Sequence, residues 1–141
     1  MIENNIKRWH AHLKGELPGG LDDLLDDDCV FLSPVVFTPQ RGKELTKLYL
    51  TAAGSTFSEG DISKAPGQSS SDFKYVKEVL CGDYAVLEFE SSIGGKYING
   101  VDIITFNEAG KIIEFKVMIR PLQAVNMIHA QMQAMLEKMQ G

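Results

Sequence analysis

One aspartate stands within an otherwise apolar stretch of the chain. Asp102 lies in the segment Val101–Phe106, where its immediate neighbours are valine and isoleucine. A buried ionised carboxylate must be paired, or its pKa rises and the group becomes neutral. A neutral carboxyl in an apolar pocket can act as an acid or donate a hydrogen bond to a ligand. A structural aspartate bonded to a backbone amide or a tyrosine is the alternative, so the direction in which Asp102 points matters.

The turn before this stretch predicts that direction. Gly94–Gly95 is a dipeptide typical of a two-residue β-hairpin, and such a turn would pair Ile93 with Lys96. Continuing the pairing along both strands places Leu87 opposite Asp102. Because directly paired residues point to the same side of a sheet, Asp102 is predicted to share a face with Leu87.

The turn after the stretch allows two registers. A four-residue loop pairs Phe106 with Lys111 and sets Phe115 opposite Asp102. A three-residue loop slips the register by one, which would put Glu114 on the apolar side. Only the first register gathers apolar residues, and we therefore expect it. The predicted apolar face around Asp102 then consists of Ala85, Leu87, Phe89, Ile98, Ile104, Phe106, Ile113, Phe115 and Val117.

Other side chains could share a pocket with this carboxyl. Gly100 lies two residues before Asp102 on the same face, and we expect it to leave a gap by which a ligand could approach. Tyr49 is on the buried side of a predicted helix. Tyr75 faces the pocket if the turn at Gly82 has three residues. Either tyrosine could bond to Asp102 or to a ligand, although such tyrosines are more often core residues.

Two histidines and a tryptophan share the first predicted helix. His10 and His12 are two residues apart, so their side chains diverge by roughly 200° and cannot hold one metal ion from the same face. We therefore expect no metal site there. His12 lies near the stripe of Trp9 and Leu13 and could reach the rim of a pocket as a proton-transfer partner. Trp9 is predicted to be a core residue that also forms part of the pocket wall.

The composition excludes several classes of protein. The chain has 141 residues, 44% of them hydrophobic, which predicts a single domain over residues 1–141. A net charge of −5 with scattered basic residues argues against nucleic acid as a partner. No apolar run approaches the roughly 20 residues of a membrane span, and the N-terminus lacks the apolar core of a signal peptide. We expect a cytoplasmic protein with Cys29 and Cys81 as reduced thiols and with no cofactor.

Helical spacing of apolar residues predicts four helices. They are expected at the N-terminus, after the glycines at 19 and 20, after Gly42, and at the end of the chain, where methionines are frequent. The four apolar stripes are Ile2, Ile6, Trp9 and Leu13; Leu21, Leu24 and Leu25; Leu45, Leu48, Tyr49, Ala52 and Phe57; and Val125, Ile128, Met132, Met135 and Met139.

Strands are predicted in two groups. Cys29–Ser33 is expected to continue as Val35–Phe37 after Pro34 interrupts it, and the acidic run Asp26–Asp28 before it is expected to be a solvated turn. A polar loop, Ser58–Ser71, precedes the second group. Helices first and consecutive antiparallel strands later predict an α+β fold in which helices pack on one face of a curved sheet. The four later strands are expected at Phe73–Leu80, Tyr84–Ile93, Lys96–Phe106 and Lys111–Ile119.

The segments "LLDDDCVFLSPVV" and "GVDIITFNEAGKIIEF", together with the Trp9 helix, occur in a familiar order. The chain resembles the ketosteroid-isomerase-like, SnoaL-like cone proteins of the nuclear-transport-factor-2-like superfamily. The resemblance implies a cone-shaped, curved antiparallel sheet wrapped around helices, with an apolar pocket at the open end. It also implies a homodimer, since dimers are common in that family.

Steroid isomerases of this family use a tyrosine on the first helix, an aspartate base before a proline, and a protonated aspartate on a late strand; the last is a standard example of a carboxyl kept neutral by an apolar site. The resemblance places Asp102 at the protonated aspartate, Trp9 at the tyrosine and Ser33 at the base, ahead of Pro34. A serine without an adjacent histidine is a poor base. Steroid isomerisation by the usual mechanism is therefore not expected.

Two functions follow as hypotheses. In the first, the protein binds an apolar small molecule with a carbonyl or hydroxyl group, and Asp102 acts as the catalytic acid or as a hydrogen-bond donor in an isomerase-, cyclase- or hydratase-like enzyme. In the second, the domain is a non-catalytic ligand-binding or homodimeric module with a vestigial pocket. The expected ligand-binding residues are Trp9, His12, Ser33, Tyr49, Tyr75, Leu87 and Phe115.

Overall fold

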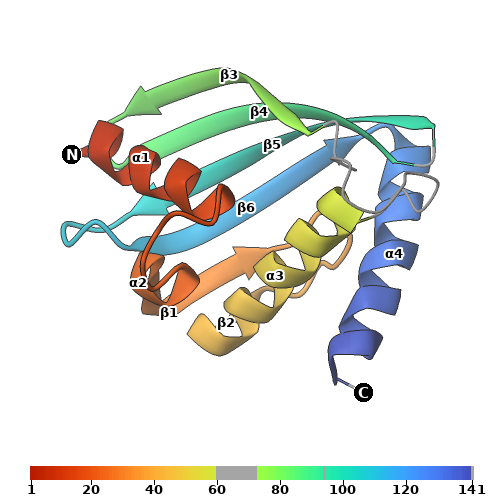
Figure 1. Ribbon diagram of the computed structural model, residues 1–141, viewed down its shortest axis with the longest axis horizontal. Helices are drawn as coiled ribbons and strands as arrows, with labels where there is room; N and C mark the ends of the chain where they lie inside the picture. Colours follow the sequence, from red (N-terminus) through yellow and green to blue (C-terminus); the bar gives the residue numbers. More distant parts are fainter. Residues whose placement is uncertain (60–72, 94, 141) are drawn as a thin grey trace.

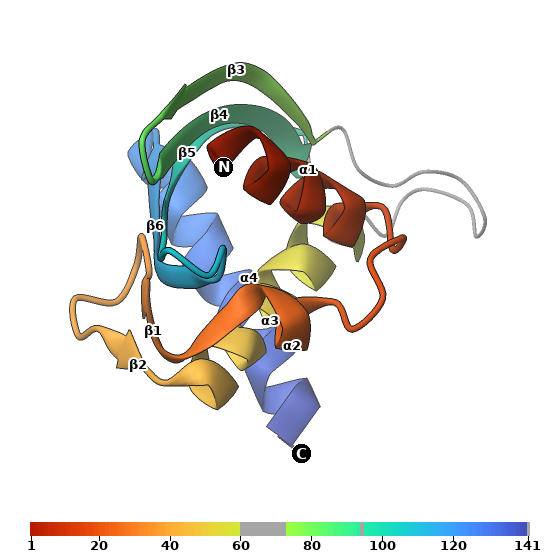
Figure 2. The same ribbon diagram turned by 90° about the vertical axis from the view of Figure 1, so that its left-hand side faces the viewer.

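The chain folds as a curved sheet of six strands with its helices on the concave side (Figure 1). The computed structural model describes residues 1–59, 73–93 and 95–140. Figure 2 shows the sheet bending around α1, while none of the described helices covers the convex face. The elements are α1 (Ile2–Leu13), α2 (Leu21–Leu24), β1 (Leu25–Leu32), β2 (Gln40–Arg41), α3 (Lys43–Glu59), β3 (Lys74–Cys81), β4 (Tyr84–Ile93), β5 (Lys96–Phe106), β6 (Ile112–Arg120) and α4 (Leu122–Gln140).

Helices α1 and α4 follow the predicted stripes, whereas Leu25, predicted as part of the second helix, is the first residue of β1. In α1, Ile2, Ile6 and Trp9 are buried against the sheet, whereas Leu13, at the end of the helix, is 47% exposed. In α4, Ile128 and Met132 are buried in a cluster that includes Phe89 and Ile98 of the sheet. Residues three and four apart share one helix face, so these stripes hold the helices against the concave side of the sheet.

The acidic run Asp26–Asp28 belongs to strand β1 and is not a turn, contrary to the prediction. The pairing between β1 and β6 is irregular over this run, because Leu25 pairs with Ile112 while Val30 already pairs with Glu114. The extra residues bulge away from the ladder, so the acidic side chains stay in contact with solvent within a strand.

The strand predicted at Val35–Phe37 is absent. The Val35 N–H donates to Ser33 Oγ over 3.1 Å, which closes a tight turn around Pro34. Phe37 is fully exposed. Proline offers no N–H to a strand ladder, and the chain therefore leaves the sheet here and returns only as the short strand β2.

The predicted α+β cone is confirmed, but its sheet is mixed and not purely antiparallel. The strand order is β2-β1-β6-β5-β4-β3, and β1 runs parallel to β6. Strands β3 to β6 are joined by short turns, which force antiparallel pairing. No such turn joins β1 to β6, because α3 and four strands lie between them in the sequence, and their relative direction is decided by packing.

One prediction falls partly outside the described residues, and another concerns a membrane span. α3 extends through Glu59, so the loop predicted at Ser58–Ser71 is helical at its start and lies outside the described residues from position 60 onward. Among the described residues, no helix is long and apolar enough to cross a membrane.

The two hairpins around β5 differ in how well they were predicted. Between β4 and β5, Ile93 pairs with Lys96 and Leu87 with Asp102, as the turn dipeptide indicated. Between β5 and β6 the predicted register is wrong by two residues, since Asp102 pairs with Val117 instead of Phe115. A shift of two keeps every side chain on its face. Asp102 is therefore on the concave side, as predicted.

The turn after β5 explains the two-residue shift in the pairing of β5 with β6. Asn107 donates its backbone N–H to the Lys111 carbonyl, and the Lys111 N–H donates back to the Asn107 side chain. This closes a longer loop than predicted and leaves an irregular pairing at Phe106. Ile112 is consequently the fully buried residue at the start of β6, while Ile113, predicted to be on the apolar face, is 37% exposed.

Candidate functional site

Asp102 lies in the middle of β5 on the concave face, between Leu87 of β4 and Val117 of β6. It is only 6% exposed. Burial deprives the ionised carboxylate of water and raises its pKa to about 7, against the opposing effect of a hydrogen bond from Tyr75. The carboxyl therefore exchanges between its neutral and ionised forms near neutral pH.

A chain of two aromatic donors leads to this carboxyl. The Tyr75 hydroxyl donates to Asp102 Oδ2 over 2.6 Å, and the Trp9 indole Nε1–H donates to the Tyr75 oxygen over 3.1 Å. The indole N–H can only donate, so the chain runs in one direction. Burial and the charge of Asp102 raise the pKa of Tyr75 well above its ordinary value, so the phenol keeps its proton. With Tyr75 donating to Oδ2, the proton of neutral Asp102 belongs on Oδ1.

Tyr75 reaches the concave face by a route that the turn did not predict. The turn at Gly82 has two residues, since Cys81 pairs with Tyr84, and this register alone would point Tyr75 outward. A bulge at Val76 changes the pairing, and Tyr75 lies opposite Phe89 on the concave face. One extra residue in a strand reverses the face of everything beyond it.

Gly100 does not leave the gap that the sequence suggested. A Cβ atom at this position would clash with Phe89 Cζ and would lie 2.8 Å from the Met118 carbonyl oxygen. The Phe89 ring therefore covers Gly100, and the glycine serves the packing of that ring. Space for a ligand lies elsewhere beside Asp102.

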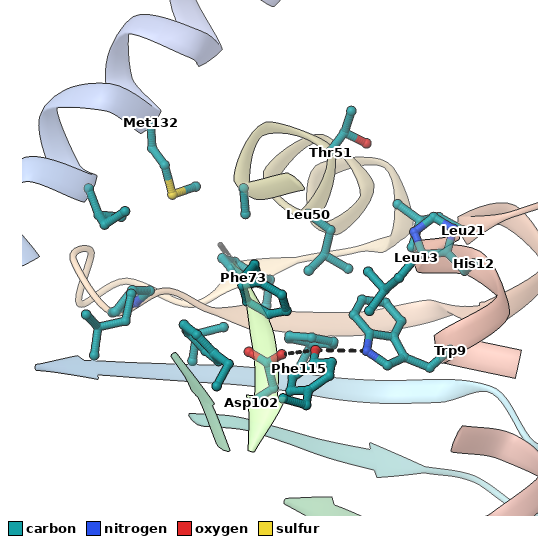
Figure 3. A pocket seen from close by; sticks show the side chains of 18 residues that line it. Trp9, His12, Leu13, Leu21, Leu50, Thr51, Phe73, Asp102, Phe115 and Met132 are labelled. Atoms are coloured by element: carbon teal, nitrogen blue, oxygen red, sulfur yellow. Dashed lines mark hydrogen bonds between the residues drawn. The ribbon is translucent and has the colours of Figure 1, made fainter. Parts of the chain in front are cut away.

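A cavity of about 540 Å³ lies between the concave face and helices α1, α3 and α4. This volume is within the range of roughly 300–1,000 Å³ typical of ligand pockets. Its polar lining side chains include Asp102, Tyr75, His12 and Thr51. Figure 3 shows Asp102 at one wall, with the donor chain from Trp9 ending on it. The apolar lining includes Phe31, Phe73, Phe89, Phe115, Ile128 and Met132.

Five of the predicted site residues meet in this cavity. Trp9, His12, Tyr75 and Phe115 line it together with Asp102. The rings of Trp9 and Phe115 are 5.0 Å apart, and those of Trp9 and His12 are 5.4 Å apart. Burial lowers the pKa of His12, which favours the neutral imidazole.

Three predicted ligand-binding residues are not among the described residues that line the cavity. Ser33 Oγ accepts the Val35 N–H in the turn around Pro34, although Pro34 itself lines the cavity. The Tyr49 ring stacks on Phe31 at 5.6 Å, behind the wall. Leu87 is fully buried beneath the surface of the sheet.

Several lining residues were not predicted as site residues. Phe89 and Val117 were already placed on the concave face by strand parity, so the signal for them was present. Met132 was predicted only as part of the apolar stripe of the last helix. Phe31 lines the cavity because β1 packs beside β6, and no pattern in the sequence indicates that neighbour.

The fold has counterparts among solved structures. A steroid delta-isomerase from Pseudomonas aeruginosa superposes with a TM-score of 0.83 and is 27% identical in sequence, over 97% of this chain and 92% of that chain. An uncharacterised bacterial protein with a cystatin-like fold from Silicibacter pomeroyi superposes with a TM-score of 0.76 and 28% identity, over 92% of this chain and 83% of that chain. Nuclear-transport-factor-2-like proteins of unknown function also match, including one from Mesorhizobium loti with a TM-score of 0.65 and 17% identity, over 85% and 91% of the two chains.

The protein has the nuclear-transport-factor-2-like fold. A protein of the SnoaL-like family from Agrobacterium tumefaciens shares this fold. It superposes with a TM-score of 0.56 and 12% identity, over 85% of this chain and 97% of that chain. No protein-family model and no curated protein matches the chain. Within the nuclear-transport-factor-2-like fold, the donor chain from Trp9 through Tyr75 to Asp102 is the feature on which a function can be argued.

Proposed function

We propose that this nuclear-transport-factor-2-like protein binds an apolar small molecule with a carbonyl or hydroxyl group, and that Asp102 donates a hydrogen bond to its oxygen. The observation that carries the proposal is a buried carboxyl in the wall of a largely apolar cavity. Tyr75 occupies Oδ2, so Oδ1 is the atom offered to a ligand. A neutral carboxyl that donates from Oδ1 favours an acceptor such as a carbonyl oxygen.

The proposal extends to an isomerase-, cyclase- or hydratase-like enzyme. It is supported by the 27% identity to a protein described as a steroid delta-isomerase. Steroid isomerisation by the family's usual mechanism is not part of it, because Ser33 stands at the position of the base. Its hydroxyl accepts a hydrogen bond from Val35 and does not line the cavity.

A matched pair of ligands tests the proposal. 1-Tetralone and tetralin share a ring skeleton, and only the former has a carbonyl oxygen. We expect the wild-type protein to prefer 1-tetralone at pH 5.5, by about three- to tenfold, the worth of one net hydrogen bond. The preference should shrink at pH 8.5, because an ionised Asp102 no longer donates and repels the carbonyl oxygen. Calorimetric titration of both ligands at both pH values gives the ratio directly.

The variant Asp102→Asn sharpens this test. Its amide can donate at any pH, so the ratio of the two affinities should not change between pH 5.5 and 8.5. A wild-type ratio that stays constant over this range would contradict the role of Asp102. The fluorescence of Trp9, the one tryptophan of the chain, reports whether a ligand enters the cavity that it lines.

The second candidate is a homodimer through the convex face. Val79 and Met118 are each about half exposed on this face, at 51% and 50%, and the described helices leave it uncovered. A second copy of the chain would bury these apolar side chains. Sedimentation of the wild type and of Met118→Glu tests this hypothesis, since a dimer through this face should dissociate in the variant and a monomer should not change.

A further inference from the structure

We propose that the ligand of the cavity is a hydroxy ketone, with its ketone oxygen at Asp102 and its hydroxyl group at the His12 imidazole. The inference deepens the proposed function and rests on it, because it assumes that Asp102 holds a ketone oxygen. It adds the class of ligand, which is a flat apolar ring system that holds two oxygen atoms apart.

The polar side chains of the cavity wall differ in how far the protein itself satisfies them. The Trp9 indole N–H and the Tyr75 hydroxyl are both used in the donor chain that ends on Asp102 Oδ2. Thr51 is exposed on α3, so water can satisfy its hydroxyl group. Of the polar side chains in the described part of the cavity wall, Asp102 and His12 therefore remain for a ligand.

His12 lacks the kind of partner that the neighbouring histidine has. His10 Nε2 lies 2.8 Å from Glu78 Oε1, whereas no described residue is hydrogen-bonded to the ring nitrogens of His12. The His12 ring is half-buried in the cavity wall, where it packs against Trp9. A polar group that loses water without gaining a hydrogen bond is costly. A ligand that bonds to the imidazole would remove this cost.

Asp102 and His12 lie at separate parts of the cavity. In Figure 3, Trp9 lies between them. The ring centroids of Trp9 and His12 are 5.4 Å apart, and the indole N–H is connected to Asp102 only through the Tyr75 hydroxyl. A ligand that contacts both Asp102 and His12 must therefore extend past Trp9, which favours two oxygen atoms held apart by a ring.

The end of the cavity at His12 is more open to solvent than the end at Asp102. Leu13 follows His12 on α1 and lines the cavity, yet it is 47% exposed, whereas Asp102 is 6% exposed. A hydroxyl group at His12 would keep access to water, while the ketone would be buried. This difference assigns the ketone to Asp102 and the hydroxyl group to His12.

The imidazole of His12 favours a hydroxyl group over a carboxylate. Burial lowers the pKa of His12, which favours the neutral ring with one N–H donor and one acceptor nitrogen. A hydroxyl group likewise donates and accepts, so it can bond to either nitrogen. A carboxylate only accepts, and an ionised Asp102 and the net charge of −5 would repel it.

Ligands that share the 1-tetralone skeleton test the inference. 6-Hydroxy-1-tetralone and 6-methyl-1-tetralone differ only in the group across the aromatic ring from the carbonyl. At pH 6 the wild-type protein should prefer the hydroxyl compound by about three- to tenfold, the worth of one net hydrogen bond. An apolar wall alone would favour the methyl compound. 1-Tetralone-6-carboxylic acid should bind no better than the methyl compound. Calorimetric titration gives all three affinities.

Variants of His12 show whether the imidazole causes the preference. His12→Phe keeps a ring beside Trp9 without nitrogen atoms and should lose the preference for the hydroxyl compound. Its preference for 1-tetralone over tetralin should not change, because Asp102 is intact. His12→Gln again offers one donor and one acceptor and should retain part of the preference. His129→Phe makes the first substitution at an exposed site and should bind as the wild type does.

Proton NMR of the three histidine rings gives a readout that does not depend on how His12→Phe folds. The hydroxyl compound should shift the Cε1–H signal of His12 more than the methyl compound does. The signals of His10, which is paired with Glu78, and of His129, which is exposed on α4, should stay in place. Equal shifts of the His12 signal with both compounds would contradict the contact.

The outcomes separate this inference from the proposed function. If 1-tetralone is preferred over tetralin but the hydroxyl compound binds no better than the methyl compound, the role of His12 is overturned and the binding function stands. A preference for the hydroxyl compound that survives in His12→Phe overturns it as well, as does tighter binding of the carboxylic acid than of the hydroxyl compound. If 1-tetralone does not bind at all, both proposals fall together.

Discussion

Strand β5 carries two buried polar residues, Asn99 and Asp102, on opposite faces of the sheet. Asn99 is 7% exposed, and both sides of its amide are engaged on the convex side. It donates to Glu88 Oε2 and to the Phe89 carbonyl, and its oxygen accepts from Arg120 Nε over 2.8 Å. Asp102 is equally buried, but Tyr75 occupies only its Oδ2.

The difference shows that a buried polar group can either stabilise the fold or remain available to a ligand. A fully bonded amide has no need of further partners and stabilises the fold. A carboxyl with one neutral donor is costly in its ionised form and offers an oxygen to whatever enters the cavity. Asn99 is therefore expected to affect stability without affecting ligand binding, whereas Asp102 is expected to affect ligand binding and to make stability depend on pH.

The largest effect is expected for Asp102→Asn on stability at alkaline pH. A folded pKa of about 7 against an ordinary value of 3.8 means that the native state holds a proton that the unfolded state has lost between these two pH values. Wild-type stability should therefore fall as pH rises from about 4 to 7, by roughly 4 kcal/mol at most. Asp102→Asn should lack this fall. Urea denaturation of both proteins at pH 4.5 and 8.5 measures the difference.

The exposed turn residue Asp83 offers a control for that experiment. Asp83→Asn should follow the wild-type pH dependence. If the stability difference between the wild type and Asp102→Asn is the same at both pH values, Asp102 does not carry a raised pKa and the contrast with Asn99 disappears.

A smaller effect, without pH dependence near 7, is expected for Asn99→Ala. The substitution leaves the Phe89 carbonyl without its side-chain donor and separates Glu88 from Arg120. We expect a loss of about 2–3 kcal/mol in the free energy of unfolding. Urea denaturation measures this loss, and calorimetry should show unchanged affinity for 1-tetralone.

Asn126, exposed on α4, provides the matched substitution, and Asn126→Ala should change stability by less than about 0.5 kcal/mol. A large loss of ligand affinity in Asn99→Ala would contradict the contrast between Asn99 and Asp102. It would mean that the hydrogen bonds of Asn99 on the convex side affect the cavity.

The smallest effect is expected for Tyr75→Phe. The hydrogen bond from Tyr75 lowers the pKa of Asp102, so its removal should raise that pKa further above 7. The pH at which the preference for 1-tetralone declines should move upward, with a stability loss of about 1 kcal/mol. Calorimetric titrations at several pH values locate the midpoint. Tyr84→Phe, an exposed tyrosine, is the control, and a midpoint that stays in place would show that Tyr75 does not act on Asp102.

Local signals predicted much of the fold because they act over a few residues. The dipeptide between Ile93 and Lys96 determines the register of β4 and β5, and apolar spacing places Trp9 on the buried side of α1. The turn between β5 and β6 was less predictable. There, hydrogen bonds between Asn107 and Lys111 select a longer loop, and turn length cannot be read from apolar pattern alone.

The partners of Asp102 were harder to predict than its face. Tyr75 reaches Oδ2 because of a bulge at Val76, and a bulge depends on how the edge strand packs. Gly100 was predicted to leave space for a ligand beside Asp102, but the ring of Phe89 covers it. In each case the deciding contact comes from another strand.

By itself, the sequence predicted the helices, strands β3 to β6 and an aspartate on the concave apolar face, since periodicity and turn chemistry are local. Only the tertiary structure decided that β1 runs parallel to β6, that Trp9 and Tyr75 donate toward Asp102, and that His12 shares the cavity while Ser33 does not. The physical reason is that a pocket is the space left between elements distant in sequence. Its shape depends on how large side chains from those elements fill or spare the volume between them.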